Sequence, residues 1–272
     1  MSQETQESTE VEEFWRAYLT TGEFEKERRQ RHFFRLLPGF PRCKSCYAPF
    51  EGAGGWVART VYGKRPSKMN PRLCNVCEDF ARHFQGGAEI ELTMLFVDVR
   101  GSTALAERMG PREFSQLINR FYVTATRIMV GSDALIDKII GDQAAAMYVP
   151  GVAGVDHARV GIHAAQAIMK ATGHAGRDGP WIALGAGVHT GIAFVGSVGS
   201  PDGTSDITVL GDAANTAARL SSLARQGEIL ISEPASLAAG LRTSGLERRE
   251  LELKGKSERV PVHVLTQYEL VG

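Results

Sequence analysis

Two short stretches, far apart in this chain of 272 residues, carry aspartates beside glycine turns. Asp98 interrupts the apolar run from Thr93 to Val99 near its end, and the turn Gly101-Ser102-Thr103 follows and opens a helical segment. Asp142 follows Gly141 between two strand-like runs. Carboxylates at neighbouring strand tips can share two hard cations, and the free amides of a glycine turn can hold phosphate. The pair of aspartates therefore predicts a two-metal site for phosphoryl transfer.

A third stretch, TVLGDAANTAARL at 208–220, adds polar groups near the start of a predicted helix. Asn215 and Arg219 are four residues apart and so share one helix face. A fixed donor such as an arginine typically contributes about 10² to 10³ in rate when it meets charge that grows in the transition state. Lys138 precedes Asp142 by four residues in the same hairpin. Each motif taken alone is also explained by ordinary strand ends, helix caps and hairpin turns.

Taken together and in this order, the three stretches resemble the class III nucleotidyl cyclases, the family of adenylyl and guanylyl cyclases, over about residues 90–264. The segments at 187–199 and 253–265 are similar to the family's glycine-rich strand pair and its closing segment. The resemblance implies that Asp98 and Asp142 bind two Mg²⁺ or Mn²⁺ ions, with the backbone carbonyl of Val99 as a further ligand. It assigns the remaining roles as follows: base reading to Lys138 with Thr208 at its partner position, ribose orientation to Asn215, transition-state stabilisation to Arg219, triphosphate contact to Lys254, and phosphate binding to the turn of Gly101, Ser102 and Thr103.

Hydrogen-bond polarity favours ATP as the substrate. A lysine only donates, so Lys138 suits the unprotonated N1 of adenine and opposes the N1–H of guanine. Thr208 stands where many family members have an aspartate that accepts from the adenine amino group, and a hydroxyl can also accept. Asp206, two residues earlier on the same strand face, is an alternative acceptor. The expected activity is that of an adenylate cyclase, which converts ATP to 3′,5′-cyclic AMP and pyrophosphate. A guanylate cyclase, or a non-catalytic nucleotide-binding regulatory protein on the same fold, remains an alternative.

The resemblance also predicts the assembly. In this family the metal-binding aspartates of one subunit face the base-reading, ribose and arginine positions of the other. Because this chain contains both sets, the resemblance implies a two-fold homodimer with two equivalent active sites.

All four cysteines occur as two C-x₂-C pairs, CKSC and CNVC, with 27 residues between them. Four thiolates in this pattern predict a structural Zn²⁺ site formed by Cys43, Cys46, Cys74 and Cys77, and an iron centre on the same sulfurs is the alternative. Residues 47–61 are expected to form a hairpin between the pairs. Ten basic against three acidic residues in 31–82 raise nucleic acid as a partner. The scarcity of interleaved aromatic residues does not favour it.

The composition is that of an ordinary globular protein, with 43% hydrophobic and 23% charged residues and a formal net charge of zero. No apolar run approaches the roughly 18 residues of a membrane span, and the polar, acidic N-terminus does not resemble a signal peptide. The clustered cysteines also differ from a secreted disulfide framework. We therefore expect a cytoplasmic protein that makes no contact with membranes.

The elements that must position these residues follow from hydrophobic periodicity. Apolar residues at helical spacing from Val11 to Leu19, and a second helical stretch from Glu23 toward Pro38, predict an N-terminal helical arm. EDFARHF after the second cysteine pair predicts a short helix, and Gln85-Gly86-Gly87 is expected to break it. The predicted domains are the arm (1–40), a zinc-binding module (41–86) and a catalytic domain (88–272).

From residue 90 the pattern predicts an α+β sandwich with helices packed on a mixed sheet, and the family resemblance implies the ferredoxin-like order βαββαβ. The predicted strands are 90–99, 133–140, 143–149, 181–196, 204–210, 228–232, 246–253 and 260–267, and the predicted helices are 112–130, 155–172, 211–225 and 233–239.

Overall fold

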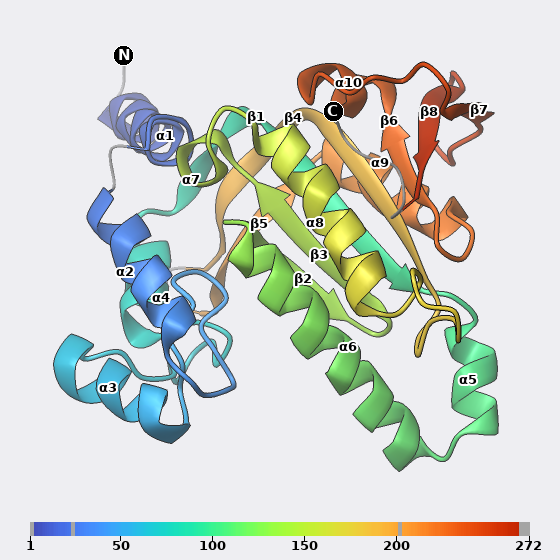
Figure 1. Cartoon of the computed structure of the whole chain (residues 1–272). Coiled ribbons are helices and arrows are strands. Elements are labelled where there is room, and N and C mark those ends of the chain that lie inside the picture. Colours follow the sequence, from blue (N-terminus) through green and yellow to red (C-terminus); the bar gives the residue numbers. More distant parts are fainter. Residues whose placement is uncertain (1–2, 23–24, 201–202, 267–272) are drawn as a thin grey trace. The chain divides into compact units, whose positions relative to one another are not determined.

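A computed structural model describes residues 3–22, 25–200 and 203–266, with side chains from residue 9 onward (Figure 1). The chain forms two compact units, and the division falls within the strands β1 (Gly86–Val99) and β4 (Leu184–Gly199). We call them the N-terminal unit and the C-terminal unit. The N-terminal unit comprises Met1–Ile90, Pro150–Gly154 and Ala193–Leu210, and the C-terminal unit comprises Glu91–Val149, Val155–Ile192 and Gly211–Gly272.

The central motif is the predicted βαββαβ unit. Its strands are β1 (Gly86–Val99), β2 (Leu135–Ile140), β3 (Gln143–Tyr148) and β4 (Leu184–Gly199). They lie in the order β2-β3-β1-β4, and the sheet continues through β6 (Ile229–Ser232), β8 (Val260–Leu265) and β7 (Glu247–Leu251), while β5 (Ser205–Leu210) pairs with β4. The described residues thus form one eight-stranded mixed sheet, which confirms the predicted α+β class.

Helices α6 (Pro111–Gly131) and α8 (His157–Ala171) pack against each other and against the hairpin of β2 and β3 (Figure 1, green and yellow). Ile118, Phe121 and Met129 recur at helical spacing on α6 and are all buried. Strand β3 lies between two other strands and is buried at every position after Gln143. The residues in its middle are small alanines, which fit this buried position. This packing fixes the hairpin turn that carries Asp142. The short helix α5 (Ser102–Arg108) follows β1, and α10 (Glu233–Ala238) follows β6.

Helix α9 (Asp212–Leu223) approaches β4 backbone to backbone. A Cβ atom placed on Gly187 would lie 2.4 Å from both the carbonyl oxygen of Ala217 and the amide nitrogen of Ser221, so only glycine fits at this position. Leu220, on the side of α9 that faces Gly187, is fully buried. The close contact fixes the height of α9, and of the polar residues on its outer face, above the sheet.

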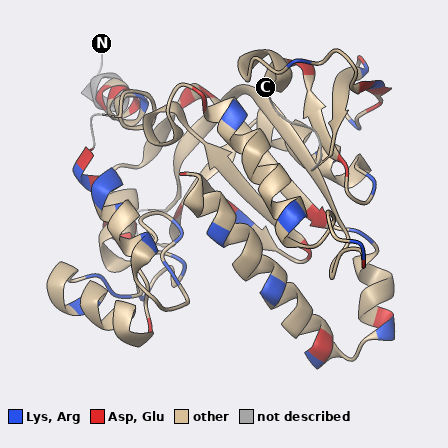
Figure 2. Cartoon of the chain, in the orientation of Figure 1, with Lys and Arg blue, Asp and Glu red and all other residues tan. Residues whose placement is uncertain are grey.

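The N-terminal unit contains α1 (Gln3–Thr20), α2 (Glu25–Leu36), α3 (Gly52–Tyr62), α4 (Asn75–His83) and the short α7 (Pro150–Ala153). Trp15 and Leu19 on α1 are each 1% exposed, and the indole nitrogen of Trp15 donates to the Phe84 carbonyl at 3.0 Å, which confirms the predicted amphipathic helix. α2 has Glu25 and Glu27 in its first turn and Arg35 in its last, charges that complement the helix dipole (Figure 2). Its predicted start at Glu23 lies outside the described residues.

The predicted hairpin at 47–61 is wrong, because α3 occupies most of that segment. A Cβ on Gly54 would lie 1.9 Å from the Pro38 carbonyl oxygen, and Ala58 one turn later is fully buried. The glycines permit close helix packing here and do not make a turn. Gly63, at φ 63°, ends the helix instead.

The largest differences between the predicted and the observed strand boundaries occur in β1 and β4. β1 begins at Gly86 instead of residue 90, since a Cβ on Gly87 would lie 2.4 Å from the Val195 carbonyl oxygen and the glycines allow the strands to approach. β4 likewise continues to Gly199. The last predicted strand ends at Leu265, and residue 267 lies outside the described residues. Among the described helices, none combines the length and the apolar composition needed to cross a bilayer.

Candidate active site and metal centre

The structure brings Asp98 and Asp142 together at one corner of the C-terminal unit. Asp98 lies opposite Gln143 in the pairing of β1 with β3, and the Val99 amide donates to the Asp142 carbonyl at 3.0 Å. The two aspartates therefore occupy adjacent strand ends, as the sequence pattern predicted.

Each carboxylate at this corner has a polar partner. Arg100 pairs with Asp98, with 2.5 Å between Nη2 and Oδ2, and the Ser102 hydroxyl donates to Asp142 Oδ2. Burial raises the pKa of the Asp98 carboxyl above its usual value, Arg100 opposes this rise, and the negative charge of Asp142 adds to it. The two carboxylates repel each other, and burial disfavours their negative charge. Added positive charge therefore stabilises this corner. The oxygen ligands present fit a hard cation such as Mg²⁺.

Further contacts hold this corner in place. The Tyr122 hydroxyl on α6 donates to the Gly141 carbonyl at 2.5 Å and so fixes the turn before Asp142. Arg100 also donates through Nη1 to the carbonyls of Ser222 at 2.7 Å and Ala224 at 3.2 Å, at the end of α9. Sequence reasoning missed Tyr122 and Arg100. The position of Arg100 two residues after Asp98 was the one available signal, whereas nothing in the spacing pointed to Tyr122.

The turn after β1 adopts the left-handed backbone conformation that glycine favours. Gly101 lies at φ 67° and precedes α5, which starts at Ser102. A side chain at Gly101 would find open space within 4 Å, and Thr103 is exposed. The turn is therefore accessible, and Ser102 faces Asp142.

The outer face of α9 carries the next two predicted residues. Asn215 is exposed and Arg219 is partly exposed, whereas Ala217 on the opposite face is fully buried. The structure gives the side chains of Asn215 and Arg219 no hydrogen bond or ion pair among the described residues. A Cβ on Gly255 would lie 3.5 Å from Arg219 Nη2, which places the guanidinium beside the loop between β7 and β8.

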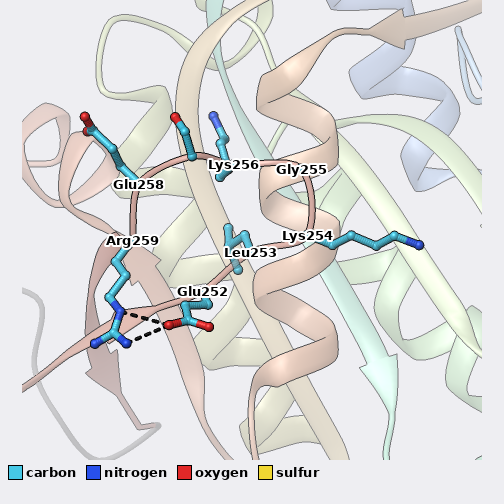
Figure 3. Close-up of a pocket in the computed structure, with 8 residues that line it drawn as sticks. Glu252, Leu253, Lys254, Gly255, Lys256, Glu258 and Arg259 are labelled. Carbon is cyan, nitrogen blue, oxygen red and sulfur yellow. Dashed lines mark hydrogen bonds and ion pairs between the residues drawn. The ribbon is translucent and has the colours of Figure 1, made fainter.

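This loop encloses a hollow of about 580 Å³ lined by residues 252–259 (Figure 3). Arg259 pairs with Glu252 at 2.6 Å across its base. Lys256 pairs with Asp212 at the start of α9, and this hydrogen bond lowers the pKa of the Asp212 carboxyl. Lys254 is exposed and extends out of the loop (Figure 3). The loop that borders Arg219 thus carries the exposed Lys254. Sequence reasoning missed the pairing of Lys256 with Asp212.

The two predicted base contacts lie in different units. Lys138 belongs to β2, where the pairing register shifts between Ile136 and Lys138, and its ammonium lies 3.3 Å from Oδ2 of the buried Asp137. Such a bulge redirects side chains at the edge of a sheet. Thr208 lies on β5 in the N-terminal unit, opposite Gly196 of β4.

The four cysteines form a compact cluster in the N-terminal unit, with all four sulfurs within 4.8 Å of one another. Cys46 Sγ lies 3.7 Å from Cys74 Sγ, and a tetrahedral site with Zn–S bonds of about 2.3 Å requires sulfur separations of about 3.8 Å. The amides of Cys74 and Cys77 donate to the sulfurs of Cys43 and Cys74, at 3.3 and 3.4 Å. The donor set and its spacing fit a tetrahedral metal ion.

A buried lysine accompanies this cluster. Lys64 is 6% exposed, and its Nζ lies 4.0 Å from Cys74 Sγ. Burial alone would lower the pKa of Lys64, but the surrounding cysteines outweigh it and raise the pKa. Hydrogen bonds from the other three cysteines lower the pKa of the Cys74 thiol. The ammonium thus compensates negative charge on sulfur, and no sequence spacing pointed to it.

Comparisons with known proteins identify the family of this chain. Residues 87–270 match the family described as the adenylate and guanylate cyclase catalytic domain. Over 186 residues the chain is 30% identical to an adenylate cyclase of Anabaena cylindrica, an alignment that covers 63% of this chain and 36% of that protein's length. The chain therefore spans well under half of that relative.

Solved structures show the same fold. The guanylyl cyclase Cya2 is 24% identical with a TM-score of 0.60, over 66% of this chain and 93% of that chain. The adenylyl cyclase CyaB from P. aeruginosa is 26% identical with a TM-score of 0.57, over 65% of this chain and 94% of that chain. Because the family match covers most of the sequence and includes both aspartate-bearing strands, this chain belongs to the family of adenylate and guanylate cyclase catalytic domains.

Proposed function

We propose that this chain is an adenylate cyclase that converts ATP to 3′,5′-cyclic AMP and pyrophosphate. The observation that carries the proposal is the convergence of Asp98 and Asp142 on adjacent strand tips. Both carboxylates, the Asn215 amide and the Arg219 guanidinium are present in the one chain. A non-catalytic member that only bound nucleotide would be expected to have lost at least one of them.

Asp98, Asp142 and the Val99 carbonyl would hold two Mg²⁺ or Mn²⁺ ions. When bound, such ions lower the pKa of the attacking 3′-hydroxyl and neutralise the departing pyrophosphate. The turn of Gly101 and Thr103 offers backbone amides to the phosphates. Arg100 and Ser102 keep the two carboxylates in place at the corner.

Charge on the reacting phosphate is met from α9 and the loop beside it. Arg219 stabilises the oxygens of the α-phosphate as negative charge grows on them, and Asn215, one turn earlier, orients the ribose. Lys254 extends from the loop that borders Arg219 and binds the triphosphate. Because the described residues leave Asn215 and Arg219 without ion pairs, both side chains are available to a ligand.

ATP is preferred to GTP because Lys138 can only donate a hydrogen bond. Its ammonium matches the N1 of adenine, and Thr208 at the partner position can accept from the adenine amino group. The family includes both adenylate and guanylate cyclases, so substrate choice rests on these two side chains.

We also propose that the active site is shared by two copies of the chain. The exposed face of α9 with Asn215 and Arg219 would meet the aspartates of the partner, giving a two-fold homodimer with two sites. Mixing Asp98→Ala chains with Arg219→Ala chains should restore activity at one site of each mixed dimer. A mixture that stays inactive while the wild type is dimeric would exclude shared sites.

The proposal for the cysteine cluster is a structural Zn²⁺ ion held by Cys43, Cys46, Cys74 and Cys77. The zinc module (41–86) would then separate the helical arm (1–40) from the catalytic domain (88–272). Thiolate ligands call for a reducing compartment, in agreement with the expected cytoplasmic location. Metal analysis of the purified protein should find one zinc per chain. Visible absorbance together with bound iron would instead show that the four cysteines hold an iron centre.

The test of the enzymatic function is a product assay. Purified protein is incubated with ATP or GTP and Mn²⁺, the cyclic products are separated chromatographically, and Asp142→Ala serves as the control. We expect cyclic AMP as the main product and none from the variant. Predominant cyclic GMP would overturn the choice of ATP, and absence of both products, with ATP still bound, would favour the non-catalytic alternative.

A further inference from the structure

The zinc module (41–86) forms hydrogen bonds and an ion pair with the first residues of β5, the strand that carries Thr208. Lys44, which directly follows Cys43, places its Nζ 2.9 Å from Asp206 Oδ2. The Asn70 amide nitrogen donates to the Ser205 carbonyl at 3.0 Å. Two segments of the module, one beside each cysteine pair, therefore hold the start of this strand. All of these residues belong to the N-terminal unit.

The ion pair is sheltered from solvent. The side chain of Lys44 is 10% exposed and that of Asp206 is 33% exposed. The second carboxylate oxygen, Asp206 Oδ1, is buried and has no hydrogen-bond partner within the described residues. Removing Lys44 would thus leave a partly buried carboxylate without its counter-charge, and we expect such a group to move toward water.

Lys44 is itself positioned by the cysteine pairs. Its amide donates to the Arg72 carbonyl at 2.9 Å, two residues before Cys74. The amide of Cys74 in turn bonds to Cys43 Sγ at 3.3 Å. Lys44 therefore lies between the two C-x₂-C segments, and its position depends on the sulfurs that a metal ion would hold together.

Asp206, at the start of β5, and Thr208 belong to one continuously paired strand. Asp206 and Thr208 are two residues apart and share one face of β5. The pairing of β5 with β4 runs in continuous register from Ser205 opposite Gly199 to Leu210 opposite Phe194. The Gln85 amide also holds the Ser205 hydroxyl at 3.0 Å. A displaced Asp206 consequently shifts or loosens Thr208.

We propose that Lys44 is a positioning residue that couples the metal state of the four-cysteine cluster to the base contact on β5. With the metal bound, the pair of Lys44 and Asp206 fixes Thr208 for adenine, and loss of the metal releases the strand. The inference rests on the proposed function only in its effect on ATP. The effect on β5 is a property of the fold and can be measured separately.

The experiment compares Lys44→Met with Lys44→Arg in the full chain. Lys68→Met is the matched control, since Lys68 is an exposed lysine of the same module. We measure bound zinc, hydrogen exchange of the amides in 205–209, and kcat and KM for ATP. Lys44→Met should keep its zinc, exchange these amides about tenfold faster and raise KM for ATP about tenfold, with kcat changed less than about threefold. Lys44→Arg should restore both values, and Lys68→Met should match the wild type.

A second arm tests the metal directly. Treating the wild type with a zinc chelator should accelerate exchange in 205–209, and the same treatment should add little to Lys44→Met, because the link is already broken. If neither chelation of the wild type nor Lys44→Met changes the exchange of these amides, the proposed coupling is overturned, whether or not the protein makes cyclic AMP. Faster exchange with an unchanged KM for ATP would overturn the role of β5 in base binding and leave the cyclase proposal standing.

Discussion

Gly187→Ala tests how closely the position of α9 controls catalysis. The new Cβ would lie 2.4 Å from the Ala217 oxygen and the Ser221 nitrogen, and ordinary van der Waals contact begins at 3.4 Å. Helix α9 must therefore move outward by about 1 Å, because its neighbours on this side are backbone atoms that cannot rotate away. A displacement of this size can reduce kcat about 10²-fold, since Asn215 and Arg219 move with the helix. Overpacking should also cost about 1–3 kcal/mol of stability.

The assay measures kcat for cyclic AMP formation well below the melting temperature, with circular dichroism to confirm that the variant is folded. Gly131→Ala, on the C-terminal turn of α6, is the matched control because a Cβ there meets nothing within 4 Å. It should keep the wild-type kcat. If Gly187→Ala is folded and turns over at the wild-type rate, the close contact does not set the position of the catalytic residues.

Three further predictions address base reading, acid stability and metal retention. Lys138→Glu replaces a donor by an acceptor, so the ratio of kcat/KM for ATP over GTP should fall by at least about tenfold, and an unchanged ratio would remove Lys138 from base reading. Burial lowers the pKa of His189 from 6.5 to about 4. The neutral imidazole should therefore contribute fully to the free energy of unfolding above pH 6.5, and up to about 3 kcal/mol of that free energy should be lost as pH falls toward 4. His189→Gln should lose that part of the pH dependence in urea unfolding, and an identical slope would contradict the assignment. Lys64→Met should weaken zinc binding about 10- to 100-fold in chelator competition, whereas wild-type affinity would show that the buried ammonium does not support the site.

The strand and helix order of residues 90–265 could be predicted because it is encoded locally. Alternation of apolar residues and helical periodicity identified β1 to β4 and the helices between them, and the short turn at Gly141-Asp142 indicated that β2 pairs with β3. The glycines were the exception. Gly54 and Gly87 suggested a turn and a break, but they serve close backbone approach in a helix and a strand, and that depends on partners elsewhere in the chain.

The candidate site was predictable to the extent that it consists of motifs. Asp98 and Asp142 stand beside recognisable turns, and the structure brings their strand ends together. The partners of charged groups were not predictable, because they are joined by tertiary packing over long separations. Lys44 and Asp206 are 162 residues apart in the sequence, and Lys64 reaches Cys74 only through the fold of the module.

The most direct test of the central claim is a Mn²⁺ titration followed by electron paramagnetic resonance, in the presence of an unreactive ATP analogue. If Asp98 and Asp142 share two cations over the triphosphate, the wild type should bind two Mn²⁺ ions per active site that Asp98→Asn and Asp142→Asn each fail to retain. Equal Mn²⁺ binding by the wild type and both variants would contradict the account, because the two carboxylates would then take no part in holding the catalytic metals.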